Sequence, residues 1–443
     1  MSLKDYRGAA VSGASDKALV QFEAALAGFH CYVGNPLAAA EQAIAEAPGF
    51  AMAHALRAHL FLSGTEAAGL APARESIAAA AAAARTDRER LHVAAATALA
   101  EGRFEDAVER FEDILLDHPR DALALQMAHL FDFYRGDARN LRDRVVRVLP
   151  NWTRDLPGYH ALQGMLAFGL EECGDYARAE EAGRRACEIE PRDAWAHHAV
   201  AHVMEMQGRV KDGIAWMRDR EAFWAPDNMI AVHNWWHLAL YHLEQEDIAA
   251  VLALYDGHVR RDRSAVVLDM VDAAAMLWRL QLREIDAGPA RWSEIAEAWA
   301  PLAGDGIYAF NDVHALVSFI GAGRRDLVDQ QLETLRRAAR SSGSSNAAMS
   351  AQVGLPVAEA LAAFAAGRYD SCVRWLRPVR GIAHRFGGSH AQRDLLDLTL
   401  IEAARRAGQD NLVRALAAER LRAKPASPLA QRYYLQAGTK AAA

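Results

Sequence analysis

Apolar residues recur along most of the chain at the three- and four-residue spacing of one helical face, and no segment shows the strict alternation of a half-buried strand. The first helical segment begins near Asp16, a residue type typical of N-caps, and continues through residues 17–26. Short segments with Gly or Pro, such as residues 33–36, interrupt the helical spacing. The pattern predicts an all-α protein.

A repeating unit underlies this pattern. It consists of Gly, a polar residue and an apolar residue, then a small residue three positions further, and a Pro that closes the second helix. Such units start at Gly102, Gly174 and Gly208, and further ones start at positions 136, 246, 323, 367 and 408. The starts at 102, 136, 174, 208 and 246 lie 34, 38, 34 and 38 residues apart. These spacings equal the 34-residue tetratricopeptide period or exceed it by about one helical turn. Because Gly permits a tight turn, each unit is expected to be a hairpin of two antiparallel helices.

Stacked hairpins of this kind predict a tetratricopeptide-like, right-handed α-solenoid whose first helices line the concave surface. We expect a single helical-repeat domain over residues 1–443, with regular hairpins over about 17–256, irregular helices over 257–345 and further hairpins over 346–443. The period is lost between about 257 and 310. The additional helices there are expected to curl the solenoid around an internal pocket.

Two rows of histidines fall on the predicted first helices. His198 and His202 lie 7 and 11 residues after Pro191, and the pair formed by His233 and His237 lies 7 and 11 residues after Pro226. Glu205 continues the first row by three residues, so its side chain shares a helical face with the two imidazoles before it. Trp195 and Asn234 belong to the same two helices and are candidate ligand contacts. In the preceding repeat the equivalent of His198 is Gly164, which indicates room for a ligand.

These rows have a structural and a functional interpretation. Polar residues on helix faces can simply be hydrogen-bonded within a groove, but a core normally avoids a cluster of polar groups that cost about 1–3 kcal/mol each when unpartnered. His-x-x-x-His can present two imidazoles to one metal ion, with Glu205 or a carboxylate from another helix completing the shell. The sequence lacks H-E-x-x-H, and imidazoles beside carboxylates serve equally well as general bases. The indoles of Trp195, Trp235 and Trp236 are more commonly packing residues than ligand contacts.

Three further motifs are weaker indications of a functional site. Gly387-Gly388 before a helix is typical of an anion-binding helix start, with Arg393 one turn later, but no complete phosphate-binding pattern is present. Ser389 and His390 are sequence neighbours, which does not give the spatial arrangement of a catalytic serine and its base. The cluster at 311–314 (Asn311, Asp312 and His314) has residue types that commonly cap a helix start.

Composition and charge exclude several classes of protein. Hydrophobic residues make up 52% of the chain and the net charge is −7, with Lys and Arg dispersed, so neither disorder nor nucleic-acid binding is expected. The cysteines are scattered without a C-x-x-C pair and are expected to be buried thiols in a reducing compartment; they are Cys31, Cys173, Cys187 and Cys372. No leader pattern and no stretch of about 20 apolar residues was identified, which predicts a cytoplasmic protein that does not bind membranes.

Several segments resemble the tetratricopeptide repeat protein 38 family. They are His160–Glu172, Ala196–His202, His233–His237, Asp272 with Trp278-Arg-Leu, Phe310–His314 and Gly388–Asp394, and they cover most of the chain from about residue 90. The resemblance implies the helical-repeat fold but no particular reaction.

The sequence thus favours a small-molecule pocket on the concave face, with hydrolytic or other acid–base chemistry as a hypothesis, metal-dependent or based on His and carboxylate groups. The candidate catalytic residues from the rows are His198, His202, Glu205, His233 and His237; Asp272 and His390 join them through the family-like motifs, and the candidate ligand contacts are Trp195, Asn234, Trp236, Asn311, His314 and Arg393. Arg393 would hold an anionic group. The alternative is a non-enzymatic scaffold that binds a peptide or protein partner. The identity of a metal or other cofactor and the oligomeric state are left open, and His202, His237 and His390 are expected to share one cavity.

Overall fold

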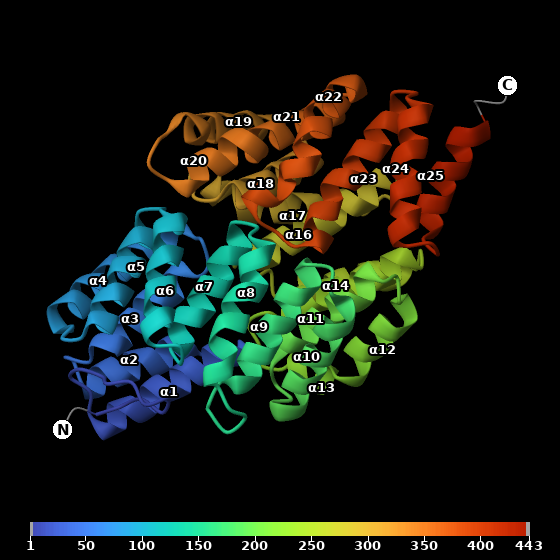
Figure 1. Cartoon of the computed structure of the whole chain (residues 1–443). Helices are drawn as coiled ribbons and strands as arrows, with labels where there is room; N and C mark the ends of the chain where they lie inside the picture. Colours follow the sequence, from blue (N-terminus) through green and yellow to red (C-terminus); the bar gives the residue numbers. More distant parts are fainter. Residues whose placement is uncertain (1–2, 440–443) are drawn as a thin grey trace. The chain divides into compact units, whose positions relative to one another are not determined.

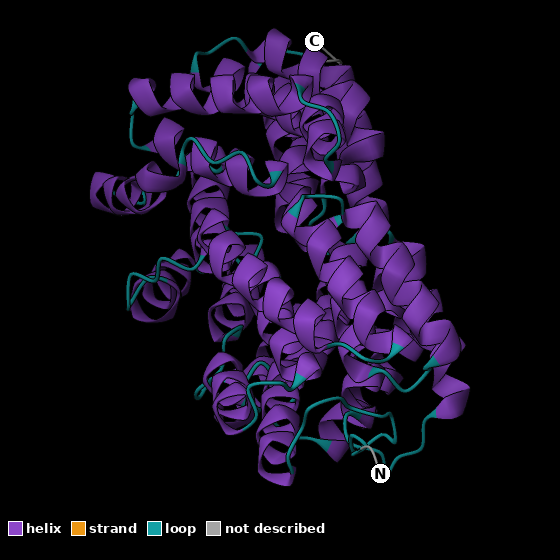
Figure 2. Cartoon of the chain, turned by 90° about the vertical axis from the view of Figure 1, so that its left-hand side faces the viewer, coloured by secondary structure: helices purple, strands orange, loops and turns teal. Residues whose placement is uncertain are grey.

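The computed structural model describes residues 3–439, and helices account for all of its regular secondary structure (Figures 1 and 2). Within these residues the β-type pairs are two isolated bridges, Lys4 with Ala10 and Val33 with Asn228. The prediction of an all-α protein is confirmed.

The described chain folds into two compact units. Unit 1 contains the chain up to Val200 together with Arg220–Ala231 and Gly343–Ser345. Unit 2 contains Ala201–Asp219, Val232–Ser342 and the chain from Asn346 onward. The division falls inside helix α11 (Ala194–Met206).

The helices of unit 1 are α1 (Asp16–Cys31), α2 (Pro36–Glu46), α3 (Ala51–Leu62), α4 (Leu70–Ala83), α5 (Asp87–Ala100), α6 (Phe104–Asp117), α7 (Ala122–Tyr134), α8 (Ala138–Val148), α9 (Tyr159–Glu172), α10 (Tyr176–Ile189) and α13 (Glu221–Trp224), with 3₁₀ turns η1 (Ala67–Gly69) and η2 (Leu149–Asn151). Its interior is formed largely by α7 and α9, whose side chains are buried around almost the whole helix circumference. Helix α1 begins at Asp16 itself. The N-cap is Ser15, whose hydroxyl accepts from the Ala18 N–H, and not Asp16 as the sequence suggested.

The helices of unit 2 are α12 (Val210–Asp219), α14 (Ala231–Glu244), α15 (Ile248–Leu254), α16 (Val267–Leu282), α17 (Pro289–Trp299), α18 (Ala309–Gly321), α19 (Arg325–Arg340), α20 (Ser345–Met349), α21 (Leu355–Ala365), α22 (Tyr369–Val379), α23 (His390–Arg406), α24 (Asp410–Ala423) and α25 (Pro428–Thr439), with π-helical turns η3 (Tyr255–Val259) and η5 (Ser350–Gly354) and 3₁₀ segments η4 (Ala300–Leu302) and η6 (Arg380–Phe386). Helix α16 is buried along nearly its whole length and packs against α18 and α23. It forms the interior on which the candidate site is built.

The predicted turns lie where the repeats placed them. Each repeat start separates two consecutive helices and adopts a left-handed backbone; the φ values are 73° for Gly102, 65° for Gly136, 80° for Gly174, 68° for Gly208, 62° for Glu246, 69° for Gly323, 71° for Gly367 and 71° for Gly408. The left-handed conformation is open to Gly without the Cβ penalty that other residues incur. A tetratricopeptide-like series of helix hairpins is therefore a property of the structure itself, whereas curling around an internal pocket stays a prediction.

Further hairpins lie outside the repeat starts and have a non-Gly residue in the left-handed conformation after their first helix. Tyr32 lies between α1 and α2 with φ of 58°, Thr65 lies between α3 and α4 with 53°, and Glu284 lies between α16 and α17 with 59°. Of the eight turns that the repeat pattern found, seven have Gly at this position and Glu246 is the exception.

Small residues allow close helix approach in both units. A Cβ on Gly183 would lie 2.6 Å from Val200 Cγ2, and a Cβ on Gly213 would lie 2.1 Å from Tyr241 Cζ. The Tyr241 hydroxyl donates to the Ala201 carbonyl at 2.5 Å, which fixes the ring that Gly213 accommodates. Both glycines therefore permit close packing of neighbouring helices.

One helical segment departs from the expectation that no stretch is long and apolar enough to cross a membrane. Residues Ser345–Ala365 form 21 consecutive helical residues. An 18-residue stretch within them has a mean hydropathy of 1.3, and 56% of that stretch is buried inside the structure. The segment is rich in Ala, and its larger apolar side chains Val357, Leu361 and Phe364 are buried. By length and composition it meets the criterion, as interior helices of globular proteins also do.

Candidate functional site

Three of the predicted imidazoles lie together in unit 2. His202 comes from α11, and His233 and His237 come from successive turns of α14. The ring centroids of His202 and His237 are 4.4 Å apart, and those of His233 and His237 are 4.8 Å apart. All three side chains are buried, with exposed fractions of 0–5%. We call these three residues the imidazole cluster.

Two carboxylates bind the imidazole cluster from neighbouring helices. His233 Nδ1 lies 2.8 Å from Asp272 Oδ2 on α16, and His237 Nδ1 lies 3.2 Å from Glu205 Oε2 on α11. Burial, followed by the neighbouring His233, holds the pKa of His237 well below its usual value, so His237 is neutral and donates its Nδ1–H to Glu205. Burial also raises the pKa of Asp272, although His233 opposes this shift. The structure therefore joins predicted residues from three helices into one hydrogen-bonded group.

Arg279 connects this group to the start of α23. Its guanidinium lies 5.2 Å from the ring centroid of Trp236, and its Nη2 donates to the Ala391 carbonyl at 2.7 Å. Trp236 in turn stacks on His233, with centroids 5.4 Å apart and an angle of 13° between the rings. Burial lowers the pKa of Arg279 to about 10, which still leaves it charged at neutral pH. Trp236 is thus a packing and cation–π partner.

Asn234, which was predicted to contact a ligand, is fully buried on α14. Neither its amide oxygen nor its amide nitrogen has a hydrogen-bond partner among the described residues. A buried amide of this kind costs free energy unless something else supplies its partner.

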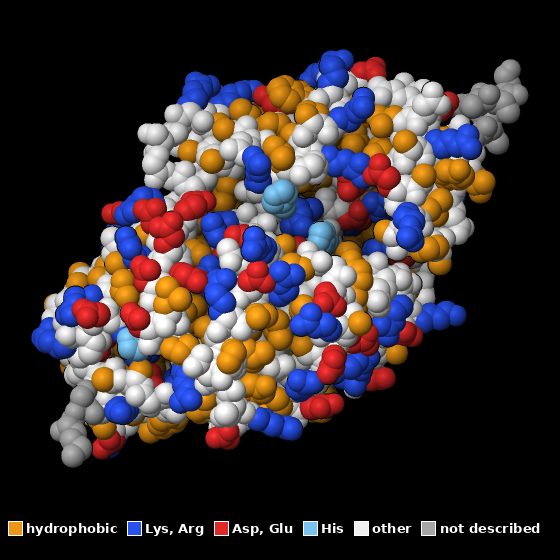
Figure 3. All heavy atoms as spheres, viewed as in Figure 1, with side chains coloured by type: hydrophobic (Ala, Val, Ile, Leu, Met, Phe, Trp, Pro, Cys, Tyr) orange, Lys and Arg blue, Asp and Glu red, His pale blue; other side chains and the backbone are white. Residues whose placement is uncertain are grey.

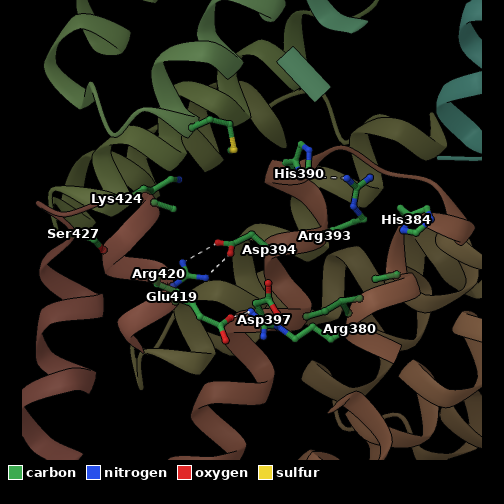
Figure 4. Close-up of a pocket in the computed structure, with 14 residues that line it drawn as sticks. Arg380, His384, His390, Arg393, Asp394, Asp397, Glu419, Arg420, Lys424 and Ser427 are labelled. Atoms are coloured by element: carbon green, nitrogen blue, oxygen red, sulfur yellow. Dashed lines mark hydrogen bonds and ion pairs between the residues drawn. The ribbon is translucent and has the colours of Figure 1, made fainter. Parts of the chain in front are cut away.

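A pocket of about 390 Å³ lies in unit 2 beside α23 and α24 (Figure 4). Its lining combines cationic, acidic and imidazole side chains; it comprises Met206, Arg380, Ala383, His384, His390, Arg393, Asp394, Leu396, Asp397, Glu419, Arg420, Ala423, Lys424 and Ser427. Of the predicted site residues, His390 and Arg393 line it, and Arg393 Nη2 lies 3.4 Å from His390 Nδ1. His390 and Arg393 therefore lie at one pocket, while their assignment to a functional site stays a prediction.

Ion pairs fix the walls of this pocket. Arg420 binds both oxygens of Asp394, and Arg380 binds Asp397 at 2.6 Å and also Glu419. Burial alone would raise the pKa of Asp394, but Arg420 holds it well below its usual range. Asp394 is therefore ionised, and the wall it forms with Arg420 is rigid.

A second, smaller cavity of about 40 Å³ adjoins the pocket. It shares Asp394, Arg420 and Lys424 with the pocket, and Glu205 also lines it. Glu205 Oε1 lies 3.6 Å from Lys424 Nζ, while the other Glu205 oxygen accepts from His237. Glu205 thus connects the pocket to the imidazole cluster.

His390 and the imidazole cluster are close but not equivalent. Burial, then His237 and more weakly His390, lower the pKa of His202 well below its usual value, so the three imidazoles interact electrostatically. His390 lines the larger pocket, whereas His202 and His237 line neither of the two pockets. His202 and His237 thus share neither of these two pockets with His390.

Trp195 and His198 pack within unit 1, against Phe168. The Phe168 ring stacks on His198 with centroids 5.5 Å apart and lies 4.9 Å from Trp195. The expectation of ligand space at Gly164 is wrong, because a Cβ there would already lie 3.4 Å from both Ala196 Cβ and Asp193 Oδ2. The glycine permits close helix packing and leaves no gap.

The residues at 311–314 do not cap a helix. Helix α18 starts at Ala309, whose N–H donates at 2.7 Å to Asn346 Oδ1 from a distant segment of unit 2, so Asn311 and Asp312 lie inside the first turn. His314 Nδ1 bonds the Phe310 carbonyl at 2.8 Å, and burial lowers the pKa of His314 to about 4. These three residues are parts of a buried helix and line neither pocket.

The two glycines before α23 serve packing and chain direction. Gly388 has a φ of 78°, and a Cβ there would lie 2.5 Å from the Phe310 ring. The helix start itself is closed by a capping box between Ser389 and Gln392, and Arg393 donates to the Gly388 carbonyl. The anion-binding interpretation of Gly387-Gly388 is therefore not needed to explain them.

Sequence reasoning missed two buried networks in unit 1. In the first, His59 Nε2 lies 3.3 Å from His92 Nδ1, and His92 Nε2 lies 3.0 Å from Asp121. Asp121 also binds Arg88, which reaches Asp5 at 3.2 Å and so fastens the N-terminal segment. Its members are about thirty residues apart in sequence and belong to successive repeats, so spacing within one helix gave no signal.

The second network joins a cysteine, a histidine and an aspartate. Cys31 Sγ lies 4.0 Å from His160 Nε2, and His160 Nδ1 lies 2.8 Å from Asp193 Oδ2. The order matches a nucleophile, a base and an orienting carboxylate, but burial raises the pKa of Cys31 far above its usual value and keeps it a thiol. The expectation of four buried cysteines is wrong for Cys173, which is exposed, and Cys187 is half-buried.

No protein-family model matches the chain. The cellulose synthase 2 operon protein C of Komagataeibacter xylinus is 30% identical over 195 residues, which is 42% of this chain and only 14% of that protein's length. Yeast Tom70 aligns over 96% of this chain and 95% of its own, with 11% identity and a TM-score of 0.34. The tetratricopeptide domain of P58(IPK) aligns over 89% of this chain and 98% of its own, with 14% identity and a TM-score of 0.21. The hairpin geometry, and not these low-scoring likenesses, supports the tetratricopeptide-like fold.

Proposed function

We propose that unit 2 binds a small molecule with an anionic group in the pocket beside α23 and α24. The supporting observation is the convergence of Arg393, Lys424 and His390 on one cavity of about 390 Å³. This volume lies within the range of roughly 300–1,000 Å³ common for ligand pockets. Arg and Lys side chains provide charge-assisted hydrogen bonds to carboxylate or phosphate oxygens.

The ion-paired walls support binding of a defined ligand. Asp394 with Arg420, and Asp397 with Arg380, hold their side chains across neighbouring helices before any ligand arrives. A wall that is already ordered loses less conformational entropy on binding. The His390 imidazole at this wall is the group from which we propose acid–base chemistry, since it lines the pocket directly.

The resemblance to the tetratricopeptide repeat protein 38 family supports the choice of unit 2. Motif residues from distant parts of the chain meet there: Asp272 binds His233, and Phe310 packs against Gly388. Trp278 Nε1 donates to Thr399 at 2.9 Å within the same unit. We propose membership of that family on this basis.

The alternative is a scaffold for a peptide or protein partner, which is the common use of helical repeats. A peptide would present the same anionic chemistry through its C-terminal carboxylate. Binding experiments with small anions and with peptides, carried out separately, therefore distinguish a free metabolite from a peptide end.

Differential scanning fluorimetry with carboxylates, phosphates and amino acids, followed by calorimetry, tests the proposal. A matched peptide series, with free and amidated C-termini, forms the second arm. We expect a small anion to bind, and we expect Arg393→Gln and Lys424→Gln to weaken binding at least ~10-fold, the loss of about one charge-assisted contact. Arg324→Gln, on an exposed arginine of unit 2 outside the pocket, should bind as the wild type does.

The outcomes separate the two functions. Binding of free-carboxylate peptides without binding of small anions favours the scaffold. Equal binding by the wild type and by Arg393→Gln would place the ligand elsewhere and remove the proposal.

A further inference from the structure

The imidazole cluster has the ligand arrangement of a metal site. One ring nitrogen from each of His202, His233 and His237 can be chosen so that all lie within 4.8 Å of one another. A tetrahedral ion with metal–nitrogen bonds of about 2.0–2.1 Å needs nitrogens roughly 3.3 Å apart, so small side-chain movements suffice. All three histidines belong to unit 2.

The carboxylates occupy the positions expected of partners that orient metal ligands. Asp272 and Glu205 accept hydrogen bonds from the Nδ1 atoms of His233 and His237. A neutral imidazole with its proton on Nδ1 carries its lone pair on Nε2, which is the atom that coordinates metal. Metal-binding histidines commonly donate their other N–H to a carboxylate in this way. Glu205, which the sequence suggested as a ligand, is thus placed as a positioning residue.

A divalent cation suits this arrangement of rings. One ion at the centre of the cluster would interact with the lone pairs of all three imidazoles at once, close to the carboxylates of Asp272 and Glu205.

We propose that His202, His233 and His237 bind one divalent metal ion of the zinc class, with Asp272 and Glu205 orienting the ligands. Three imidazole nitrogens suit zinc and leave a coordination position for water, as in catalytic zinc sites. The site does not depend on the anion pocket, although Glu205 lies between the two.

Metal analysis of protein purified without chelator tests this proposal. We expect about one zinc ion per chain in the wild type, as for a three-histidine site with one open coordination position. His237→Gln and His202→Gln should lose the ion. His242→Gln, on the same helix as His237 but bound to Asp247 at 3.5 Å, is the matched control and should keep it.

Two further measurements keep the proposal testable if the histidine variants do not fold. Asp272→Asn keeps the volume of the side chain and should weaken zinc binding roughly 10–100-fold in competition with a chelator of known affinity. Addition of Co²⁺ to chelator-treated wild type should give the visible absorption of a tetrahedral nitrogen site.

The proposal fails if folded wild type takes up no stoichiometric Zn²⁺ or Co²⁺, or if His237→Gln and His242→Gln bind the ion equally. Anion binding by Arg393→Gln and zinc binding by His237→Gln are measured separately. Failure of the metal site therefore leaves the proposed pocket untouched, and the reverse also holds.

Discussion

Replacement of Asp312 by Asn should stabilise unit 2 in a strongly pH-dependent manner. Asp312 is buried on α18, where its Oδ1 accepts from Gln331 Nε2 at 2.9 Å. Its Oδ2 has no hydrogen-bond partner among the described residues. Burial raises the pKa of Asp312 to about 7, although the Gln331 hydrogen bond opposes this shift.

The magnitude follows from proton linkage. The pKa rises from 3.8 to about 7, a change of roughly three units, and each unit corresponds to about 1.36 kcal/mol. Between these values the folded state binds more protons than the unfolded state, so stability falls as pH rises from about 4 to about 7. Above pH 7 the wild type has lost up to about 4 kcal/mol, and Asn, which cannot ionise, should recover most of it.

Urea denaturation of the wild type and Asp312→Asn at pH 4.5 and pH 8 measures this difference. The variant should be close to the wild type at pH 4.5 and clearly more stable at pH 8. Asp326→Asn, on an exposed carboxylate in unit 2, controls for the substitution itself and should show no such gain at pH 8. A variant that is equally stable or less stable than the wild type at pH 8 would refute the assignment of a protonated, desolvated Asp312.

Three further results are expected. Gly213→Ala should destabilise unit 2 by roughly 1–3 kcal/mol in urea denaturation, because its Cβ has no space, whereas Gly381→Ala, with no atom within 4 Å, should not. Asp121→Ala should cost about 3–5 kcal/mol in thermal unfolding at pH 7, because it leaves Arg88 buried without this partner; a loss below about 1 kcal/mol would contradict this. Iodoacetamide followed by mass spectrometry should modify Cys173 well before Cys31, and the reverse order would contradict the burial of Cys31.

The turns of the fold could be predicted where the sequence has Gly, the residue best suited to a left-handed backbone. Gly136 and Gly323 mark turns because a left-handed backbone favours Gly, and both adopt it. Thr65 adopts the same conformation with φ of 53°, but its residue type gave no sign of a turn. Only the tertiary packing of α3 on α4 explains that backbone.

Part of the candidate site could also be predicted, because helical spacing indicates which side chains share a face. Helical spacing placed His233 and His237 on one face, and the structure brings both to the imidazole cluster. Spacing could not show that Glu205 and Lys424 approach each other, because 219 positions separate them and only the packing of unit 2 joins them. It also could not show that Gly164 is filled, since the filling side chain comes from Asp193 in the next repeat.

The surface on the face seen in Figure 3 carries Lys and Arg side chains interspersed with Asp and Glu, as the dispersed charge of the sequence predicted. No basic block is visible on that face.

Two buried groups of charged residues differ in how burial and neighbouring charges set their pKa values. Burial opposes ionisation of both Asp121 and Arg88, but their direct contact outweighs it, so the pKa of Asp121 is lowered and that of Arg88 is raised. In unit 2 burial dominates instead, raising the pKa of Asp272 and lowering that of Arg279. The first network favours its charged forms and so stabilises the fold at neutral pH. In the second group burial disfavours the charged forms, which lowers stability wherever these residues are ionised.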